Sequence, residues 1–139
     1  MIKHTYEQHI LPHMIDYVCS RASFEKSRAM LIPKAAGRVL EIGIGTGRNF
    51  DYYDKTKITT FHGIDPALHY KAQRRALANG IEVTLNPISA ERIPAEDNSY
   101  DTVVSTFTLC SIDDVQSALA EIRRVLAPTG TFLFLEHGT

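Results

Sequence analysis

The sequence predicts an α/β protein with a doubly wound, mostly parallel sheet, and three observations lead to this prediction. Short apolar segments typical of buried strands alternate with longer amphipathic segments typical of helices, from residue 38 to residue 136. The first apolar segment runs directly into a glycine-rich turn, which is where such sheets bind nucleotides. With 139 residues, of which 44% are hydrophobic, the chain can form one domain with its own core.

The first strand and the turn after it organise the rest of the chain. Residues 39–42 read Val-Leu-Glu-Ile, and Gly43, Gly45 and Gly47 follow at every second position. Because glycine has no side chain, a ligand can lie directly against this backbone. A turn that only closes the corner between strand and helix is the alternative. A short helix is expected over residues 48–53.

The spacing of this turn argues against two nucleotide motifs. A dinucleotide-binding turn needs glycine where this chain has Arg48, and a phosphate-binding loop ends in Gly-Lys-Ser/Thr, which is absent. Glu41 precedes the first glycine at the mouth of the strand, where its charge would repel a pyrophosphate. The same carboxylate suits a ligand that carries an ammonium and a sulfonium group.

The second strand is expected over residues 58–64, and Asp65 and Pro66 follow it. Asp65 stands about 20 residues after the turn, the spacing at which an acidic residue meets a ribose in nucleotide-binding sheets. A carboxylate can accept hydrogen bonds from both ribose hydroxyls. Asp65 and Pro66 also make a good start for a helix over residues 67–79, and the two roles are compatible.

The remaining elements continue the alternation. The helix over residues 67–79 offers Tyr70, Ala72, Ala76 and Leu77 for packing. Beyond it we expect strands over residues 81–85, 102–107 and 131–136, a helix from Asp113 to Leu126 and a turn over residues 128–130.

The N-terminal part is expected to be helical. An amphipathic helix over residues 5–20 and a second one starting at Ser23 would form a lid of residues 1–36, and residues 37–139 would form the sheet domain. His9 and His13 lie one helical turn apart, but a zinc site needs further ligands, so we expect no metal.

Composition excludes several other classes. The net charge of −1 gives no electrostatic case for nucleic acid. No apolar run near 18 residues and no leader pattern occur, so neither a membrane span nor a signal peptide is expected. Cys19 and Cys110 are too few for a disulfide framework, which favours a reduced, cytoplasmic protein.

The Glu-x-Gly-x-Gly-x-Gly pattern of residues 41–47 resembles the first motif of the class I S-adenosylmethionine-dependent methyltransferases. The resemblance extends over residues 38–136, and residues 105–112 and 135–138 are similar to a branch of small bacterial methyltransferases related to thiol methyltransferase-like proteins. It implies a Rossmann-like sheet of five strands in the order 3-2-1-4-5 and S-adenosylmethionine as the cofactor.

The resemblance also implies which residues contact the cofactor. Residues 88–101 resemble the adenine-binding loop, although Ser89 replaces the usual aspartate; a solvent loop is the alternative. Residues 106–112 should lie opposite the glycine turn, where Cys110 is expected to be a small packed residue, since methyl transfer needs no nucleophile. The candidate cofactor-binding residues are Glu41, Gly43, Gly45, Thr46, Gly47, Asp65, Pro66, Ala90, Glu91 and Thr106.

The implied reaction is methyl transfer to a small-molecule acceptor by direct displacement. No catalytic residue is assigned, and Tyr6, His9 and His137 are the first positions to test. Family members continue for further strands, so a cofactor-binding but inactive domain, or a partner subunit, is the alternative. Residues 132–135 would then form an unpaired edge strand, which predicts a homodimer or higher assembly.

Overall fold

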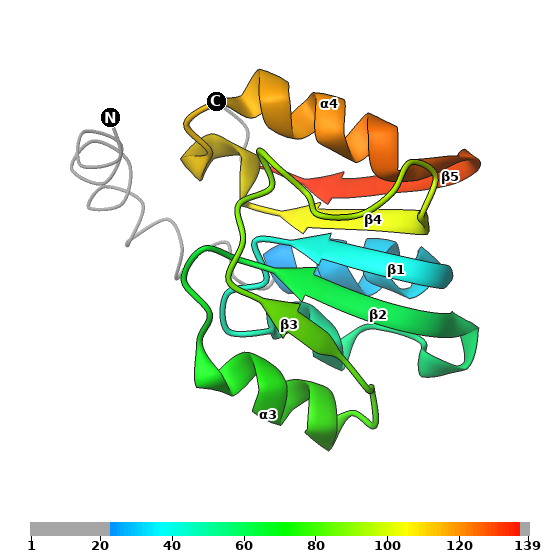
Figure 1. Cartoon of the computed structure of the whole chain (residues 1–139). Helices are drawn as coiled ribbons and strands as arrows, with labels where there is room; N and C mark the ends of the chain where they lie inside the picture. Colours follow the sequence, from blue (N-terminus) through cyan, green and yellow to red (C-terminus); the bar gives the residue numbers. More distant parts are fainter. Residues whose placement is uncertain (1–22, 137–139) are drawn as a thin grey trace.

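The structure is a computed structural model that describes residues 23–136 (Figure 1). The expected helix over residues 5–20, with Tyr6 and His9, and the candidate His137 lie outside the described residues. The strands are β1 (Gly37–Ile42), β2 (Ile58–Ile64), β3 (Thr84–Asn86), β4 (Tyr100–Thr106) and β5 (Leu126–Leu135). The helices are residues 23–31, α3 (Tyr70–Ala78), α4 (Val115–Val125) and the 3-10 turns η2 (Ile32–Lys34), η3 (Arg48–Asp51), η4 (Lys55–Lys57) and η5 (Leu109–Ser111).

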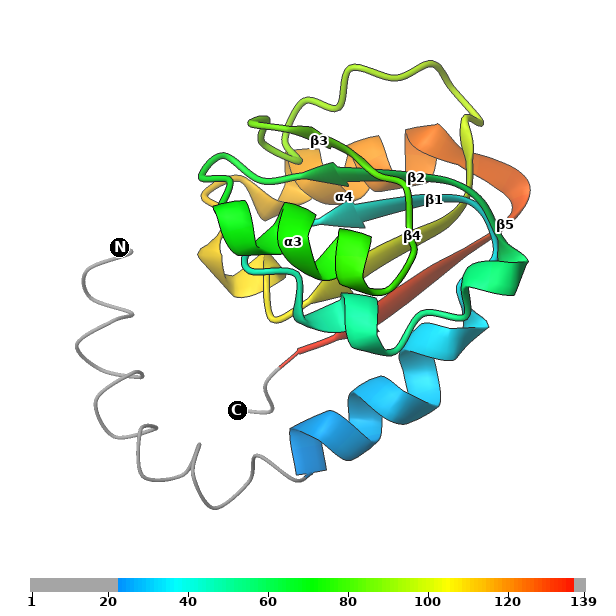
Figure 2. The same ribbon diagram turned by 90° about the horizontal axis from the view of Figure 1, so that it is seen from below.

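The five strands form one sheet in the order β3-β2-β1-β4-β5, and every pairing is parallel, which confirms the predicted architecture. Residues 31–35, η3 and α3 pack on one face, and α4 packs on the other (Figure 2). The strands β1 and β4 lie between them, buried along most of their lengths. Their carboxyl ends meet at one edge, where a doubly wound sheet binds its ligand.

The third strand is shorter than predicted. Only Thr84–Asn86 pairs with β2, and residues 81–83 lie outside the sheet. The Ile81 N–H donates to the carbonyl of Ala76 at 2.9 Å, and the Ile81 side chain is buried. Ile81 therefore packs against α3, which is why its alternating pattern does not produce a longer strand.

The helix after β2 begins later than predicted. Asp65 does not cap it: its cap is His69, whose Nδ1 accepts from the Lys71 N–H at 3.2 Å. Ala72 and Ala76 are buried as expected, but Tyr70 and Leu77 are 64% and 76% exposed. α3 thus packs on the sheet through two alanines, whose small side chains allow the helix to approach the sheet closely.

The connection from β1 to β2 contains the 3-10 turns η3 and η4 instead of the short helix expected over residues 48–53. Phe50 and Tyr53 still enter the core, where both rings contact Phe61. A Cβ at Gly47 would approach the Cα of Ala72 to 2.9 Å. The turn therefore packs directly on α3.

The last helix and strand also differ in detail from the prediction. Asp114, and not Asp113, caps α4, since its Oδ1 accepts from the Ser117 N–H at 3.1 Å. The pairing of β5 with β4 passes from Tyr100–Leu126 directly to Thr102–Thr131. Residues 127–130 form a bulge there, so the predicted turn is an interruption within one strand.

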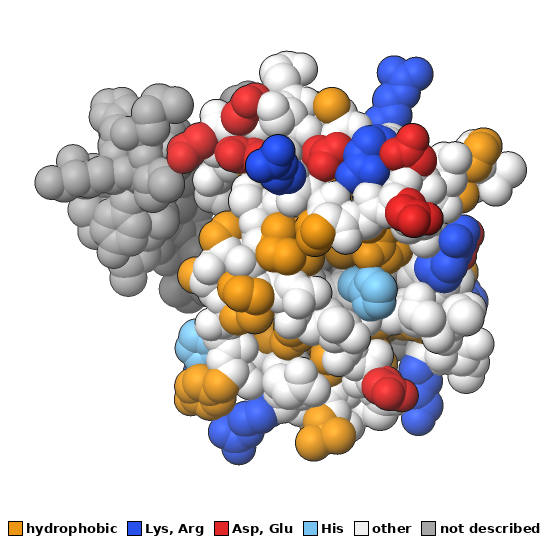
Figure 3. All heavy atoms as spheres, in the orientation of Figure 1, with side chains coloured by type: hydrophobic (Ala, Val, Ile, Leu, Met, Phe, Trp, Pro, Cys, Tyr) orange, Lys and Arg blue, Asp and Glu red, His pale blue; other side chains and the backbone are white. Residues whose placement is uncertain are grey.

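The strand β5 is an edge of the sheet and pairs only with β4 among the described residues. Leu133 is buried, whereas Phe134 is 53% exposed and stacks on Phe132 with ring centroids 5.0 Å apart. Acidic and basic side chains lie side by side in the region of α4 (Figure 3). Arg124 of α4 forms ion pairs with Asp97 and Glu121.

Candidate functional site

The glycine turn after β1 presents open backbone at one position. Gly45 has a φ of +54°, and a Cβ placed there would meet no atom within 4 Å. Gly43 is glycine for another reason, since a Cβ there would lie 2.2 Å from Thr108. Gly47 packs on Phe50 and α3. Of the three glycines, Gly45 is therefore the one that leaves room for a ligand against the chain.

Asp65 fixes this turn from the end of β2. Its Oδ2 accepts from the Gly45 N–H at 2.9 Å, and its Oδ1 accepts from the Ala67 N–H at 2.8 Å. A carboxylate oxygen has a second lone pair, so both oxygens retain acceptor capacity for hydroxyl groups. Thr46 points elsewhere, and its hydroxyl lies 3.5 Å from Nη1 of Arg75 on α3.

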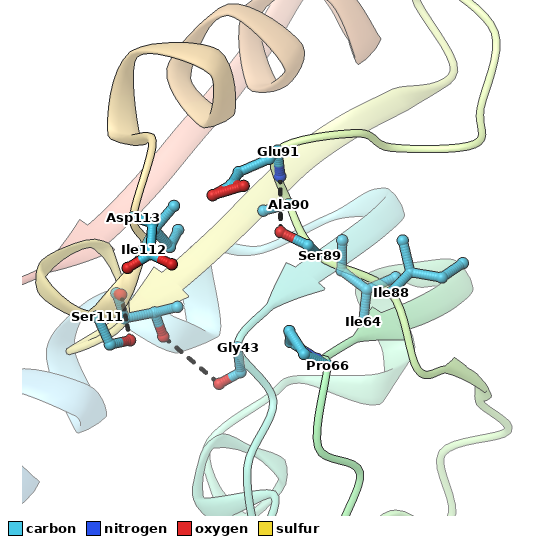
Figure 4. Close-up of a pocket in the computed structure, with 11 residues that line it drawn as sticks. Gly43, Ile64, Pro66, Ile88, Ser89, Ala90, Glu91, Ser111, Ile112 and Asp113 are labelled. Carbon is cyan, nitrogen blue, oxygen red and sulfur yellow. Dashed lines mark hydrogen bonds between the residues drawn. The ribbon is translucent and has the colours of Figure 1, made fainter. Parts of the chain in front are cut away.

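A cavity of about 390 Å³ opens beside the turn at the carboxyl edge of the sheet (Figure 4). The loop after β3 lies on one side of it and the loop after β4 on the other. Of the predicted residues, Gly43, Pro66, Ala90 and Glu91 line it. The other lining residues are Ile64, Ile88, Ser89, Thr108, Ser111, Ile112 and Asp113.

Glu91 connects the loop after β3 to Asp114, the residue that caps α4 directly after the loop that follows β4. Its N–H donates to the Ser89 hydroxyl at 3.2 Å, and its Oε1 accepts from the Asp114 N–H at 3.0 Å. Part of the acceptor capacity of Glu91 is thus already used by the protein. We call the two loops, residues 88–91 and 108–113, the wall side of the site.

Glu41 lies at the carboxyl end of β1, as expected, but its side chain is enclosed by the protein instead of open to a ligand. Its side chain is 2% exposed, with Oε1 2.7 Å from the Tyr53 hydroxyl and Oε2 3.2 Å from Nδ2 of Asn49. Burial raises the pKa of Glu41 to about 8, although the two hydrogen bonds and the charge of Arg28 lower it. The group is therefore largely protonated at neutral pH and presents no full negative charge.

Asn49 connects Glu41 to two further elements. It is 1% exposed, its Oδ1 accepts from Nε of Arg28 at 3.1 Å, and its Nδ2 also donates to the Thr106 hydroxyl at 3.1 Å. Arg28 comes from the helix of residues 23–31 and Thr106 ends β4. We call Glu41, residues 43–47, Asn49 and Asp65 the turn side of the site.

Sequence reasoning missed Asn49 and Arg28. Both lie in segments predicted to be helical, where a polar residue normally faces solvent, and nothing in the pattern marks them as buried. The turn η3 brings Asn49 over the end of β1, and a buried amide must find partners there. Glu41, in contrast, was predicted from its position in the motif, although the burial of its side chain was not predicted.

The end of β4 lies opposite the glycine turn, as predicted. The Thr108 hydroxyl is 3.5 Å from the carbonyl of Gly43. Cys110 is exposed, so the expectation of a packed residue is wrong. Partial desolvation of its sulfur and the nearby charge of Glu136 raise the pKa of this thiol, which makes it a weaker nucleophile.

The described residues contain neither a metal site nor a membrane-spanning helix. No group of three His, Cys, Asp or Glu residues between positions 23 and 136 could hold a metal ion. Within the same part of the chain, no helix has the length and apolar character needed to cross a membrane.

Known proteins are similar to this chain over most of its length. A family model described as a methyltransferase domain matches residues 40–134. Thiol S-methyltransferase TMT1B of Homo sapiens is 36% identical over 112 residues, which cover 74% of this chain and 44% of that protein. Methyltransferase OMS1, mitochondrial, of Saccharomyces cerevisiae is 31% identical over 132 residues, which cover 81% of this chain and 28% of that protein.

A solved structure gives the same result for the fold. The SAM-dependent methyltransferase of Thermotoga maritima, described as a possible histamine N-methyltransferase, has a TM-score of 0.59 and 27% identity. The comparison covers 94% of this chain and 59% of that one. The chain spans less than half the length of the two curated relatives, thiol S-methyltransferase TMT1B and methyltransferase OMS1.

Proposed function

Because the chain belongs to the methyltransferase domain family, we propose that it binds S-adenosylmethionine and transfers the methyl group to a small-molecule acceptor. The observation that carries this proposal is the open backbone at Gly45, held by Asp65 beside a cavity of about 390 Å³. A cavity of this size and largely apolar lining suits one nucleoside.

The residues in and beside the cavity fit such a cofactor, and Asp65 lies beside it, between the lining residues Ile64 and Pro66. Asp65 has the free lone pairs needed to accept from ribose hydroxyls. Ile88, Ala90 and Ile112 offer apolar surface for a flat adenine ring, and Glu91 keeps one carboxylate oxygen without a described partner. The cofactor supplies an activated methyl group on a sulfonium leaving group.

The contribution of the protein to catalysis would be alignment and exclusion of water. Displacement at a methyl carbon demands a defined approach geometry, which rigid walls supply. The cavity is lined by no His, Lys or Tyr among the described residues. An acceptor that ionises by itself needs no such base, so a thiol is the first acceptor class to test. The similarity to thiol S-methyltransferase TMT1B supports the same choice.

A cofactor-binding domain without turnover, or a partner subunit, is the second candidate. The chain spans 44% of thiol S-methyltransferase TMT1B and 28% of methyltransferase OMS1, so an acceptor site in those proteins can involve segments beyond the matched region. Tyr6, His9 and His137, which lie outside the described residues, stay candidates for acceptor contacts.

A reduced, cytoplasmic setting also stays a prediction.

Two measurements test the proposal. Isothermal titration calorimetry with S-adenosylmethionine and S-adenosylhomocysteine is expected to give saturable binding with one site per chain. Transfer of a tritiated methyl group to a panel of thiols, phenols and quinols then separates the two candidates. Binding with transfer supports the enzyme, binding without transfer supports the second candidate, and the absence of binding contradicts both.

A further inference from the structure

Two of the segments that carry the sequence resemblance contact each other: residues 107–109 of the segment 105–112 bond to Leu135 and Glu136, the described part of the segment 135–138. Oε1 of Glu136 accepts from the Thr108 N–H at 3.3 Å and from the Leu109 N–H at 3.1 Å. We propose that Glu136 is a positioning residue of the cofactor site, because it holds the loop after β4 against the glycine turn. This inference rests on the proposed function.

The loop that Glu136 holds begins with a strained residue. Phe107 has a φ of +53°, a left-handed conformation that is unfavourable for a bulky side chain, and its N–H donates to the carbonyl of Leu135 at 2.8 Å. The next two N–H groups belong to the start of η5, where helical turns leave donors unpaired. A carboxylate that accepts both donors offsets the strain and stabilises this conformation.

The position of the loop matters because it forms one wall of the cavity. Thr108 approaches Gly43 so closely that no side chain would fit at residue 43, and its carbonyl accepts from the Ser111 N–H at 2.9 Å. Thr108 and Ser111 both line the cavity, whereas Glu136 does not. Glu136 therefore acts on the site through Thr108, from outside the cavity.

Cys110 provides a reporter of this arrangement. It is an exposed free thiol within η5, two residues from Thr108, and the charge of Glu136 contributes to raising its pKa. Loss of the negative charge at residue 136 increases the thiolate fraction of Cys110 and hence its rate of alkylation. Substitution of Cys19 by Ser leaves Cys110 as the single cysteine of the sequence.

The experiment compares Glu136→Gln and Glu136→Ala in the Cys19→Ser protein. Gln keeps an acceptor oxygen for the two N–H groups but removes the charge, whereas Ala removes both. We expect Glu136→Gln to bind S-adenosylhomocysteine within about threefold of the parent and Glu136→Ala to bind about tenfold more weakly, the scale of one charged hydrogen bond. Calorimetry is done at a temperature at which circular dichroism shows every variant folded.

Glu82→Ala is the matched control, because Glu82 is an exposed carboxylate before β3. It should change neither the dissociation constant nor the alkylation rate of Cys110 by iodoacetamide. The same dissociation constant in Glu136→Ala as in the parent overturns the inference. Should the parent bind no S-adenosylhomocysteine, the proposed function fails by itself. Cys110 then decides about the contact: faster alkylation in both Glu136 variants supports it, and unchanged alkylation rejects it.

Discussion

The turn side and the wall side of the site are built in different ways. On the turn side, Glu41 and Asn49 are buried and hydrogen-bonded to residues of four elements, and Asp65 holds the backbone of Gly45. On the wall side, single carboxylates hold the loops: Glu91 accepts one backbone N–H, that of Asp114, and Glu136 accepts two, those of Thr108 and Leu109. This difference predicts that changes at the buried residues of the turn side, Glu41 and Asn49, affect folding. Changes at Asp65 and on the wall side should affect mainly binding.

The largest effect is expected for Glu41→Ala. The substitution removes the acceptor of the buried Tyr53 hydroxyl and one of the two acceptors of the Asn49 amide nitrogen, and it opens a small cavity. We expect a loss of about 3–5 kcal/mol in the free energy of unfolding, measured by urea denaturation at pH 7. Glu41→Gln is the control, since its amide can replace the protonated acid with little loss. Equal stability of all three proteins would contradict a preformed turn side.

The stability of the parent protein is expected to depend on pH through Glu41. Its pKa is raised from 4.5 to about 8 on folding, so the folded state binds the proton more tightly than the unfolded state. The contribution of protonated Glu41 to the free energy of unfolding is therefore complete below pH 4.5, and it is lost as the pH rises to 8. We expect unfolding to become easier by about 2–3 kcal/mol between pH 5 and pH 7.5. The decline should be absent in Glu41→Gln; its persistence there would assign it to another group.

Asp65→Ala tests the turn-side residue that is expected to bind the cofactor directly. Removal of the carboxylate frees the Gly45 N–H and takes away the expected ribose acceptor. Cofactor affinity should fall by about 1.5–3 kcal/mol, the scale of charged hydrogen bonds. Calorimetry with S-adenosylhomocysteine measures this, and Asp65→Asn, which keeps one acceptor oxygen, should lose less. An unchanged dissociation constant would remove Asp65 from the site.

The smallest effect on stability is expected for a substitution on β5, the edge strand of the sheet next to the wall side of the site. We propose that β5 pairs with another copy of the chain, because edge strands with exposed apolar residues recruit partners. Phe134→Lys should then convert a dimer into a monomer in light scattering while changing the free energy of unfolding by less than about 0.5 kcal/mol. Leu77→Lys, at an exposed position on α3, should leave the dimer intact. A monomeric parent protein would refute the pairing.

The sequence predicts those features that follow from local patterns. The strand β2 has the predicted bounds, the strand order is correct, and Ala72 and Ala76 form the buried face of α3. The bounds of β2 and the buried face of α3 follow from apolar periodicity, whereas the strand order is what the family resemblance implied. The turn side was located in the same way, because its glycines and Asp65 have a fixed spacing along the chain.

Features that depend on distant contacts were missed. Glu41 was expected at the mouth of β1, yet Asn49 and Tyr53 cover it once η3 folds back over the strand. Arg124 belongs to the helix predicted from Asp113 to Leu126, and its side chain donates to the carbonyls of Ile93 and Ala95 at 2.8 and 2.7 Å, which the helix pattern does not predict. No local pattern encodes such bonds, because they form only after separate elements have packed.

The burial of Ile32 and Ala35 has a practical consequence for shortened versions of the protein. Both side chains are fully enclosed in the cluster that contains Val39 of β1 and Phe61 of β2. A version that starts at residue 37 would expose this apolar surface to water and is expected to aggregate during expression. A fragment for crystallisation should therefore begin before the helix of residues 23–31, even though the sheet itself starts at Gly37.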